Sequence, residues 1–433
     1  MRSVASFALG CKVNQAESEA IAEAFAKKGY DIKSIDEKAD VYVINTCTVT
    51  NFGDKKSRQL LRKVKKLNPD AVVVAAGCYA QTDQKAIEDM PEVDIIVGTK
   101  GRNHIVESVE KFLEDKKRIN IVGDIMKERE FESISINSLA GRTRAYIKIQ
   151  DGCSQFCSYC IIPYARGPIR SRDEEDVINE VKKLALNGFK EVVLTGIHVA
   201  SYGKDNHKTD LLSLIKKVNL IDGIERIRLS SVEPNIVTEE FAHDLSLMPK
   251  VCRHFHLSLQ SGCDKTLKAM NRKYTCQRYM EAVDTLRKYM PDVAITTDII
   301  VGFPGESDED FEESFGFASK VRFSKIHVFP YSPKKGTPAA KMPQVDSKIK
   351  SERSARLIKL SEKLENEFIN GFVGQKLEVL FEKRENGFFE GHTSNYIHTL
   401  VETDKDIKNK IVPVVINKAY NGKAVGSLCD ILD

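Results

Sequence analysis

Three cysteines stand close together near the middle of the 433-residue chain, at positions 153, 157 and 160. Thiolates with this spacing bind three irons of a [4Fe–4S] cluster and leave the fourth iron without a protein ligand. A structural zinc site uses four protein ligands, and no second Cys-x-x-Cys pair follows nearby. Buried cysteines with no ligand role are the other alternative. The run Cys153-x-x-x-Cys157-x-x-Cys160 therefore predicts an iron–sulfur cluster whose open iron holds a further molecule.

Three more cysteines each follow an apolar run in the first part of the chain. The runs cover residues 4–9, 41–44 and 71–76, and the cysteines that follow them are Cys11, Cys47 and Cys78. Each run is predicted to be a strand, with an amphipathic helix after the first strand, ending near Gly29. Alternating strands and helices form parallel sheets whose carboxyl edge binds ligands, so these thiols are expected to converge. The alternative is that each is a small core residue at a strand end.

The remaining elements must position these two sets of thiols. Residues 140–370 alternate between predicted strands at 144–150, 191–195, 226–231, 254–259, 294–301 and 325–329 and predicted helices that include 174–187, 211–220, 275–289 and 308–320. Six β–α units indicate a partial TIM-type (β/α)6 barrel, with chemistry at the carboxyl-end loops and an open side that admits a large substrate. The chain is thus predicted to be α/β, with a parallel α/β domain at 1–122 and a linker at 123–139.

Beyond a charged helix at about 347–370, residues 371–433 change to short alternating strands, predicted at 376–382, 388–393, 398–402 and 424–429. This pattern fits a small β-barrel. The segment carries eight Lys or Arg against nine Asp or Glu. Any RNA binding there would depend on a local patch or on the aromatic side chains of Phe388, Phe389 and Tyr396.

Composition narrows the class of protein. The chain is 42% hydrophobic and 30% charged, and no apolar run reaches the ~20 residues of a membrane span. It opens on a strand pattern rather than a signal peptide, so we expect a cytoplasmic protein without a membrane partner. Ten cysteines in a reducing compartment favour metal or redox chemistry over disulfides. The other four, at Cys252, Cys263, Cys276 and Cys429, lack a common spacing and are interpreted as structural, and neither His198 nor His207 is given a role.

The central cysteine run, with Tyr159 before its last cysteine, resembles the signature of radical S-adenosylmethionine (SAM) enzymes. The continuation Ile161-Ile-Pro-Tyr-Ala-Arg-Gly-Pro-Ile-Arg-Ser-Arg172 is similar to that of the methylthiotransferases, which insert sulfur into an unactivated C–H bond and methylate it. Residues 9–18, 45–50 and 77–81 match the amino-terminal domain of that family. The resemblance covers essentially the whole chain in the family's domain order, and the tail resembles the tRNA-binding TRAM-like domain.

The resemblance implies two [4Fe–4S] clusters and SAM as cofactors. The cluster at Cys153, Cys157 and Cys160 would reduce SAM to a 5′-deoxyadenosyl radical, and a second cluster at Cys11, Cys47 and Cys78 would present sulfur. Positions at predicted strand ends would contact SAM, by analogy with the superfamily: Gly196, Ser230, Glu233, Gln260 and Gly302, together with Tyr159 in the cysteine loop. An electron donor such as flavodoxin or ferredoxin is implied, while the sulfur donor is not fixed by the sequence.

The implied substrate is tRNA, and basic residues are the candidates for contacting it. Arg166, Arg170 and Arg172 follow the cysteine loop and are predicted to meet phosphate or carboxylate, the alternative being ion pairs with Asp173 or Glu174. Residues 142, 144 and 148 (Arg, Arg and Lys) extend this basic neighbourhood, and residues 54–66 carry seven Lys or Arg and one acid. That basic helix is either a solvated face or a surface for phosphates.

The motifs look most like the branch of the family that acts on N6-threonylcarbamoyladenosine beside the anticodon. The branch acting on N6-isopentenyladenosine and the branch modifying a ribosomal protein aspartate are the alternatives. A hypothesis of another class is a non-catalytic RNA-binding protein whose clusters are structural or redox-sensing. Sets of three cysteines argue against it, because a purely structural cluster normally takes four protein ligands.

Overall fold

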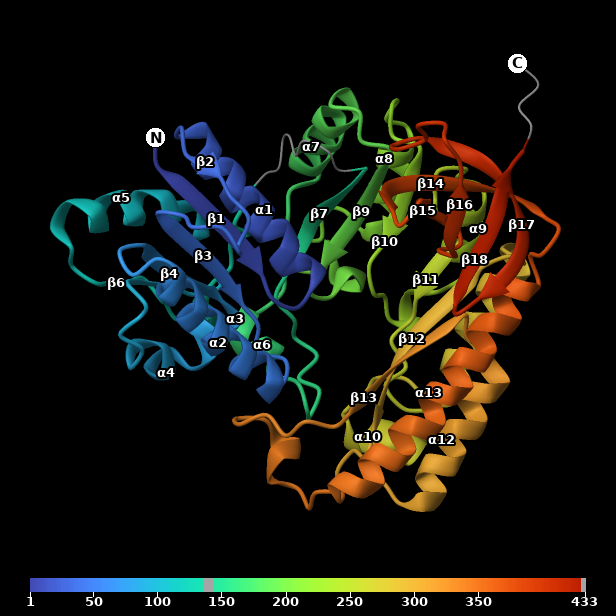
Figure 1. The fold of residues 1–433 in the computed structure, drawn as a ribbon. Helices are drawn as coiled ribbons and strands as arrows, with labels where there is room; N and C mark the ends of the chain where they lie inside the picture. Colours follow the sequence, from blue (N-terminus) through green and yellow to red (C-terminus); the bar gives the residue numbers. More distant parts are fainter. Residues whose placement is uncertain (135–142, 430–433) are drawn as a thin grey trace.

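The computed structural model describes residues 1–134 and 143–429 and begins with a six-stranded parallel sheet (Figure 1). The strand order is β2-β1-β3-β4-β5-β6. The strands are β1 (Ser3–Ala8), β2 (Asp31–Ile32), β3 (Val41–Thr46), β4 (Val72–Gly77), β5 (Ile95–Val97) and β6 (Ile119–Asn120). The three predicted strands are confirmed as β1, β3 and β4, whereas the short β2, β5 and β6 carry too few apolar residues to stand out in the sequence.

Helices cover both faces of this sheet because its strands are apolar on both sides. They are α1 (Lys12–Lys27), α2 (Asn51–Leu67), α3 (Cys78–Thr82), α4 (Gln84–Glu88) and α5 (Ile105–Asp115). Tyr42 and Ile44 of β3 pack in one core cluster with α2, while Val41 and Val43 pack in the other with α1 and α5. Continuous apolar runs of this kind are typical of parallel strands buried on both faces.

The central part is an open, curved arrangement of six parallel strands, as predicted. They are β7 (Arg144–Asp151), β9 (Glu191–Gly196), β10 (Arg226–Leu229), β11 (His254–His256), β12 (Ala294–Val301) and β13 (Lys325–Pro330), and β8 (Arg170–Ser171) pairs antiparallel with β7. Two sheets, β10-β9-β7-β8 and β11-β12-β13, are joined by the isolated bridges Ile227–Val251 and Val232–Leu257. The partial (β/α)6 barrel is therefore confirmed.

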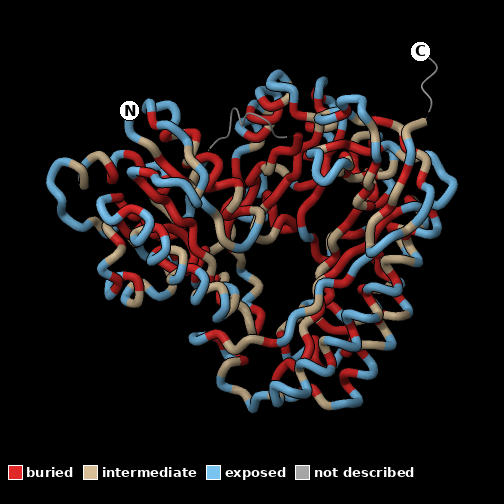
Figure 2. The backbone as a smooth tube through the Cα atoms, in the orientation of Figure 1, coloured by how far each residue is buried: buried red, intermediate tan, exposed pale blue. Residues whose placement is uncertain are grey.

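Helices surround the outer face of this barrel. The short α6 (Ile162–Arg166) is not among them, because it packs against α3 of the amino-terminal part. The outer helices are α7 (Glu174–Leu186), α8 (Leu211–Asn219), α9 (Glu239–Ser246), α10 (Asp264–Ala269), α11 (Cys276–Tyr289), α12 (Asp308–Val321) and α13 (Ser347–Asn370). Ala145, Ile147 and Ile149 of β7 pack in the core with these helices, so the alternate residues Arg144 and Lys148 face the interior of the barrel. The interior is polar, whereas the hydrophobic core lies between strands and helices. Figure 2 shows that many residues along the strands are buried.

The carboxyl-terminal segment is a closed barrel with strand order β14-β15-β16-β18-β17. Its strands are β14 (Lys376–Glu385), β15 (Phe388–Thr393), β16 (His398–Glu402), β17 (Ile411–Tyr420) and β18 (Lys423–Leu428), of which β17 was not predicted. Arg226 at the start of β10 donates hydrogen bonds of 2.8 Å to the carbonyls of His392 and Glu378. The small barrel thus packs against the amino ends of the central strands, opposite the predicted chemistry.

Two of the aromatic residues named as candidates for RNA contact, Phe389 and Tyr396, have rings that pack against other residues of the protein. Phe389 is buried in the barrel core. The Tyr396 ring stacks on His254 and on His392, each at 4.6 Å between centroids, and the Arg228 guanidinium lies 4.5 Å from its centroid. Tyr396 thus connects the small barrel to the central barrel. A ring held between these partners has no face left for a nucleobase.

The described part of the predicted linker is well packed. Ile125 is buried, and Gln81 Nε2 donates to the Gly123 carbonyl at 2.8 Å. Glu132 forms an ion pair with Arg102 at 3.0 Å. This connection is therefore held against the amino-terminal sheet, while the predicted domain boundaries stay predictions. Arg142 lies outside the described residues, and within those residues no helix has the length and apolar character needed to cross a membrane.

Candidate active site

The loop after β7 carries the first set of thiols, and backbone geometry fixes its shape. Gly152 has φ +74°, and a Cβ there would lie 1.9 Å from the Pro168 carbonyl oxygen, so only glycine fits. The Cys153 amide donates to the Gly167 carbonyl at 3.0 Å, and the Cys160 amide donates to the Cys157 carbonyl at 3.0 Å. These hydrogen bonds curl the loop so that its three cysteines share one region.

Burial keeps two of these thiols protonated when no metal is near. Burial raises the pKa of Cys153 to about 11 and that of Cys160 to about 12, and a charge on Cys157 raises both further. Arg272, on the loop after α10, donates from Nη1 to Cys157 Sγ at 3.3 Å. No sequence pattern pointed to Arg272, because its partner is 115 residues away.

The second set of thiols gathers where neighbouring strands of the amino-terminal sheet end. The order β2-β1-β3 places a topological switch between β1 and β3, the point at which open parallel sheets bind ligands. Gly10 has φ +90°, and a Cβ there would lie 2.6 Å from Cys47 Sγ. Asn14 holds the two strand ends together, since its Nδ2 donates to the carbonyls of Leu9 at 2.7 Å and Thr46 at 3.1 Å.

Cys78 completes this set at the end of β4. Thr46 Oγ1 donates to the Ala76 carbonyl at 2.6 Å and accepts from the Ala80 amide at 3.3 Å, which aligns the ends of β3 and β4. Burial raises the pKa of Cys47 to about 11, with smaller contributions from charges on Cys78 and Cys11. Cys11 is exposed as a residue, yet desolvation of its thiol also raises its pKa. The hydrogen bonds of Asn14 and Thr46 thus bring the strand ends that carry the three cysteines to one edge of the sheet.

The donor chemistry of the two thiol sets fits iron–sulfur clusters. Among residues 1–134 and 143–429, no group of three His, Cys, Asp or Glu is arranged to hold one metal ion. Sulfur is the donor that iron–sulfur clusters use, and the positive charge of iron would offset the burial that keeps these thiols protonated.

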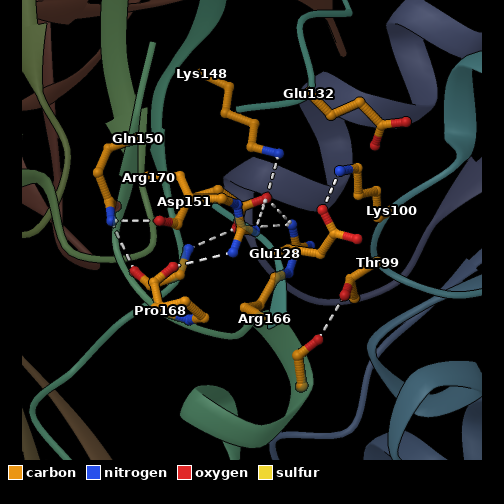
Figure 3. A network of polar contacts seen from close by, with 12 residues as sticks. Thr99, Lys100, Glu128, Glu132, Lys148, Gln150, Asp151, Arg166, Pro168 and Arg170 are labelled. Carbon is orange, nitrogen blue, oxygen red and sulfur yellow. Dashed lines mark hydrogen bonds and ion pairs between the residues drawn. The ribbon is translucent and has the colours of Figure 1, made fainter. Parts of the chain in front are cut away.

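A buried ion network joins the two sets. Arg166 of α6 has no exposed surface and contacts Glu17 of α1 at 2.6 Å and Asp151 of β7 at 3.3 Å. Lys148 Nζ also contacts both carboxylates, at 2.8 Å and 2.6 Å. Figure 3 shows Lys148, Asp151, Arg166 and Arg170 directed toward one another. The network spans the interface between the amino-terminal sheet and the barrel.

Charge balance decides the protonation of these carboxylates. Burial by itself would raise the pKa of Glu17, but the charges of Arg102, Arg166 and Lys148 outweigh it and hold the pKa well below its usual range. Burial likewise opposes ionisation of Asp151, whose pKa is nevertheless lowered by Lys148, Arg166 and Arg170. Both groups are therefore ionised at neutral pH, and each buried cation has a partner.

The prediction that Arg166, Arg170 and Arg172 contact tRNA phosphates is wrong for this structure. Arg166 and Arg170 are buried in the network just described, and Arg172 is buried in an ion pair with Glu180. The structural alternative holds, although the partners are Glu17, Asp151 and Glu180 rather than the adjacent acids. A guanidinium enclosed by carboxylates has no free face for phosphate.

Several predicted SAM-contacting residues do lie together at the carboxyl ends of β9 and β10. Glu233 accepts from Arg272 at 2.8 Å and pairs with His198 Nε2 at 3.0 Å. His198 therefore belongs to the site, although no role was predicted for it. The Ser230 hydroxyl is buried and has no hydrogen-bond partner among the residues that the structure describes. Gly196 closes against the Gln150 side chain, where a Cβ would lie 2.9 Å from Oε1.

The other three residues predicted to contact SAM, at positions 260, 302 and 159, have different surroundings from one another. Gln260 has φ +71° and bridges β11 to β12, with its amide donating to the Asp298 carbonyl at 2.9 Å. The space beside Gly302 is occupied by Lys350, whose Cγ would lie 2.3 Å from an added Cβ, so protein rather than cofactor accounts for this glycine. The Tyr159 ring packs edge-on to Phe303 at 6.4 Å. A cleft of about 880 Å³ opens between the loops after β9 and β10 and reaches Glu233.

Comparison with known proteins supports the same interpretation. Residues 147–318 match the Radical SAM superfamily, and residues 3–98 match the uncharacterized protein family UPF0004. The chain is 44% identical to the threonylcarbamoyladenosine tRNA methylthiotransferase MtaB of Bacillus subtilis, over 97% of this chain and 94% of that protein. This chain belongs to the radical SAM methylthiotransferases.

The chain is also similar to a second group of tRNA-modifying enzymes and to solved structures of other radical SAM proteins. The methylthiotransferase is 36% identical to the tRNA-2-methylthio-N(6)-dimethylallyladenosine synthase of Pelotomaculum thermopropionicum, over 99% of this chain and 98% of the relative. Among solved structures, the radical SAM methyltransferase TsrM of Kitasatospora setae superposes with a TM-score of 0.55 at 16% identity, covering 78% of this chain and 75% of that one. The second likeness concerns the fold alone.

Proposed function

We propose that this methylthiotransferase adds a methylthio group to C2 of N6-threonylcarbamoyladenosine at position 37 of tRNA. The observation that carries the proposal is the pair of three-thiol sets, which lie at the carboxyl edges of two parallel arrangements of strands and are joined by one buried ion network. The choice of nucleoside is supported by the relative at 44% identity, which is named for this substrate.

Each thiol set is proposed to hold one [4Fe–4S] cluster. Cys153, Cys157 and Cys160 would hold the cluster that binds SAM, and the auxiliary cluster would be held by Cys11, Cys47 and Cys78. When bound, these groups supply the radical that removes hydrogen from C2 and the sulfur that replaces it. The electron would come from a donor such as flavodoxin or ferredoxin, and we place the reaction in the cytoplasm, where tRNA and these donors meet.

The chain's own residues would bind and orient SAM. The unpartnered Ser230 hydroxyl needs a polar partner, which a ribose or methionine group of SAM supplies. Glu233 is fixed by Arg272 and His198, so its carboxylate is positioned before any ligand arrives. Gln260 is fixed beside β12, because its amide donates to the Asp298 carbonyl and its carbonyl accepts from the Ile300 amide, each at 2.9 Å. Preorganised groups of this kind lower the cost of ordering a ligand.

The polar interior of the barrel suits a nucleoside that carries a carboxylate. Lys12, directly after Cys11, has its pKa lowered by burial and by the nearby charges of Arg228 and Arg144, which belong to β10 and β7. The Lys12 side chain is half-buried, and its ammonium group is close enough to these two strands to feel the charges of Arg228 and Arg144. The threonylcarbamoyl group bears a carboxylate, whereas the dimethylallyl group is neutral and apolar, so the charged interior favours the former.

Aromatic residues replace the buried arginines as the proposed tRNA contact. Phe156, in the cysteine loop, is 43% exposed, and Tyr164 of α6 is 44% exposed. Their rings meet edge-to-face at 5.9 Å. Exposed rings bind unstacked bases of single-stranded loops, and the lysines of α2 provide charge for the phosphates.

Mass spectrometry of tRNA nucleosides tests the substrate. Deleting the gene should remove the methylthio group from threonylcarbamoyladenosine alone, and restoring the wild-type gene should return it. Variants with Cys11→Ala or Cys157→Ala should not restore it, because each removes one ligand of a cluster. Loss of the methylthio group from dimethylallyladenosine instead would overturn the assignment in favour of the second group of relatives. SAM cleavage by the anaerobically reconstituted protein separates an enzyme from a non-catalytic iron–sulfur protein.

A further inference from the structure

Arg166 makes an unusual set of contacts for a side chain with no exposed surface. Its Nε lies 3.2 Å from Cys78 Sγ, Nη1 lies 2.6 Å from Glu17 Oε1, and Nη2 lies 2.6 Å from Asn14 Oδ1. Nη1 also lies 3.3 Å from Asp151 Oδ1. All three guanidinium nitrogens are therefore committed inside the protein, and one of them points at a thiol.

These contacts connect Arg166 to residues beside both thiol sets. Asn14 and Glu17 lie on the first turns of α1, which begins directly after Cys11. Asp151 ends β7 two residues before Cys153, and the Cys153 amide donates to the carbonyl of Gly167, the neighbour of Arg166. A single planar guanidinium is thus bonded to the surroundings of Cys11, Cys78 and Cys153.

The neighbouring charges hold the guanidinium in place. Thr99 Oγ1, at the edge of the amino-terminal sheet, donates to the Ala165 carbonyl at 2.5 Å and fixes the backbone beside Arg166 (Figure 3). Glu17 and Asp151 together also bind Lys148. If Arg166 moved away from these carboxylates, a buried charge would be left without a partner, which is strongly destabilising. The network therefore holds the guanidinium in one arrangement.

A hydrogen bond to a cluster thiolate affects its electronic properties. The N–H dipole and the positive charge stabilise negative charge on sulfur, and reduction adds negative charge to a cluster. Hydrogen bonds to the ligand sulfurs therefore raise the reduction potential. The other thiol set shows the same device, because Arg272 donates to Cys157 Sγ and is held by Glu233.

We infer that Arg166 is a positioning residue that tunes the auxiliary cluster through Cys78 and fixes its placement relative to the SAM-binding cluster. The inference rests on the proposed function, since it requires a cluster at Cys11, Cys47 and Cys78. It assigns to Arg166 a role in the reaction that does not involve contact with tRNA.

The test uses the full-length chain, reconstituted anaerobically, with Cys153, Cys157 and Cys160 replaced by Ala so that only the auxiliary cluster forms. Redox titration followed by electron paramagnetic resonance gives its midpoint potential. In this background Arg166→Gln should reduce the ratio of reduced to oxidised cluster about tenfold at a fixed poise, a shift of about 59 mV to lower potential. Arg166→Lys, which keeps the charge but not the planar fork, should give a smaller shift in the same direction.

Arg172→Gln is the matched control. Arg172 is also a buried arginine in an ion pair, with Glu180, and it makes no contact with a cysteine in the described residues. It should lower thermal stability without moving the potential. A purely structural role for Arg166 predicts that all three variants behave alike, with normal iron content and an unchanged potential, and that result would overturn the inference.

A measurement on the unsubstituted arginine covers the case in which the variants do not fold. With 15N-labelled arginine in the triple-alanine background, the reduced cluster should show hyperfine coupling to a guanidinium nitrogen. Absence of that coupling while the cluster is present contradicts the inference alone. Absence of any cluster in this background contradicts the proposed function instead.

Discussion

At the scale of single residues, glycines show how closely the backbone approaches the reacting groups. Gly10 and Gly152 each have a positive φ and each faces an atom that a Cβ would strike, Cys47 Sγ in the first case and the Pro168 carbonyl oxygen in the second. Left-handed backbone costs other residues about 1–2 kcal/mol. The steric contact adds a penalty that depends on the neighbour, and at Gly10 the neighbour is a proposed cluster ligand.

Gly10→Ala should therefore disrupt the auxiliary cluster selectively. The added methyl group would displace Cys47 Sγ, so iron bound by the reconstituted protein should fall by about half, since one of two clusters is lost. SAM cleavage by the remaining cluster should persist. Gly29→Ala is the control, because Gly29 has φ +84° with nothing within 4 Å of an added Cβ. Equal iron content in the two variants would show that Cys47 needs no such precise placement.

At the scale of elements, the cysteine loop and α6 each present one exposed aromatic ring, and the two rings contact each other. Phe156 has φ +48°, an unfavourable backbone for a residue other than glycine, and its carbonyl is held by Asn271 Nδ2 at 2.9 Å. Residues with an unfavourable backbone conformation of this kind are concentrated at functional sites. The pair Phe156 and Tyr164 thus offers a base-stacking surface whose position is set by the loop that carries the thiols.

Phe156→Ala should weaken binding of the anticodon stem-loop while leaving cluster content unchanged. Loss of one base-stacking contact costs about 1–3 kcal/mol, which raises Kd about 5- to 150-fold. Fluorescence anisotropy with a labelled stem-loop measures the change. Leu220→Ala is the matched control, because Leu220 is an exposed apolar side chain at the end of α8. If the Phe156→Ala variant binds the stem-loop as tightly as the control variant does, Phe156 does not contact RNA.

At the scale of the whole molecule, buried charges hold the three parts of the chain together. Glu17 and Asp151 lie between the amino-terminal sheet and the barrel, while Arg144 contacts Glu191 at 2.7 Å and Glu382 of the small barrel at 2.9 Å. Burial opposes ionisation of Glu191, yet Arg228 and Arg144 lower its pKa to about 2. These interfaces therefore depend on carboxylates that stay ionised.

Unfolding in urea should show a corresponding dependence on pH. Carboxylates whose folded pKa is depressed stabilise the protein above their unfolded pKa, and this stability is lost as pH falls through the folded pKa. For Glu17, Asp151 and Glu191 the loss should begin below about pH 4.5 and continue toward pH 2. Each unit of depression is worth about 1.4 kcal/mol. The buried His254, whose pKa is lowered chiefly by burial, should add a decline that begins near pH 6.5.

Glu17→Gln provides the comparison for this titration. The variant should be less stable than the wild type at neutral pH, because Arg166 and Lys148 lose an ionised partner. The difference between the two proteins should narrow as the pH falls and Glu17 becomes protonated. A constant difference across the acid range would show that the charge of Glu17 contributes nothing to the interface.

The sequence by itself determined the chemistry and the order of the elements. The spacing of Cys153, Cys157 and Cys160 and the apolar runs before Cys11, Cys47 and Cys78 are local patterns, and they predicted the thiol sets and the amino-terminal parallel sheet. The short alternating strands of residues 371–433 predicted the closing β-barrel in the same way. Which polar residues meet was decided only by tertiary structure. In the sequence, Arg166 is a cation beside the cysteine loop and was predicted to contact tRNA. Its actual partners Glu17 and Cys78 lie 149 and 88 residues away along the chain, and no local pattern links them. Arg272 and His198 likewise gain their roles from distant contacts. Periodicity and spacing record what a residue does within its own element, whereas burial and ion pairing depend on which elements the fold places against it.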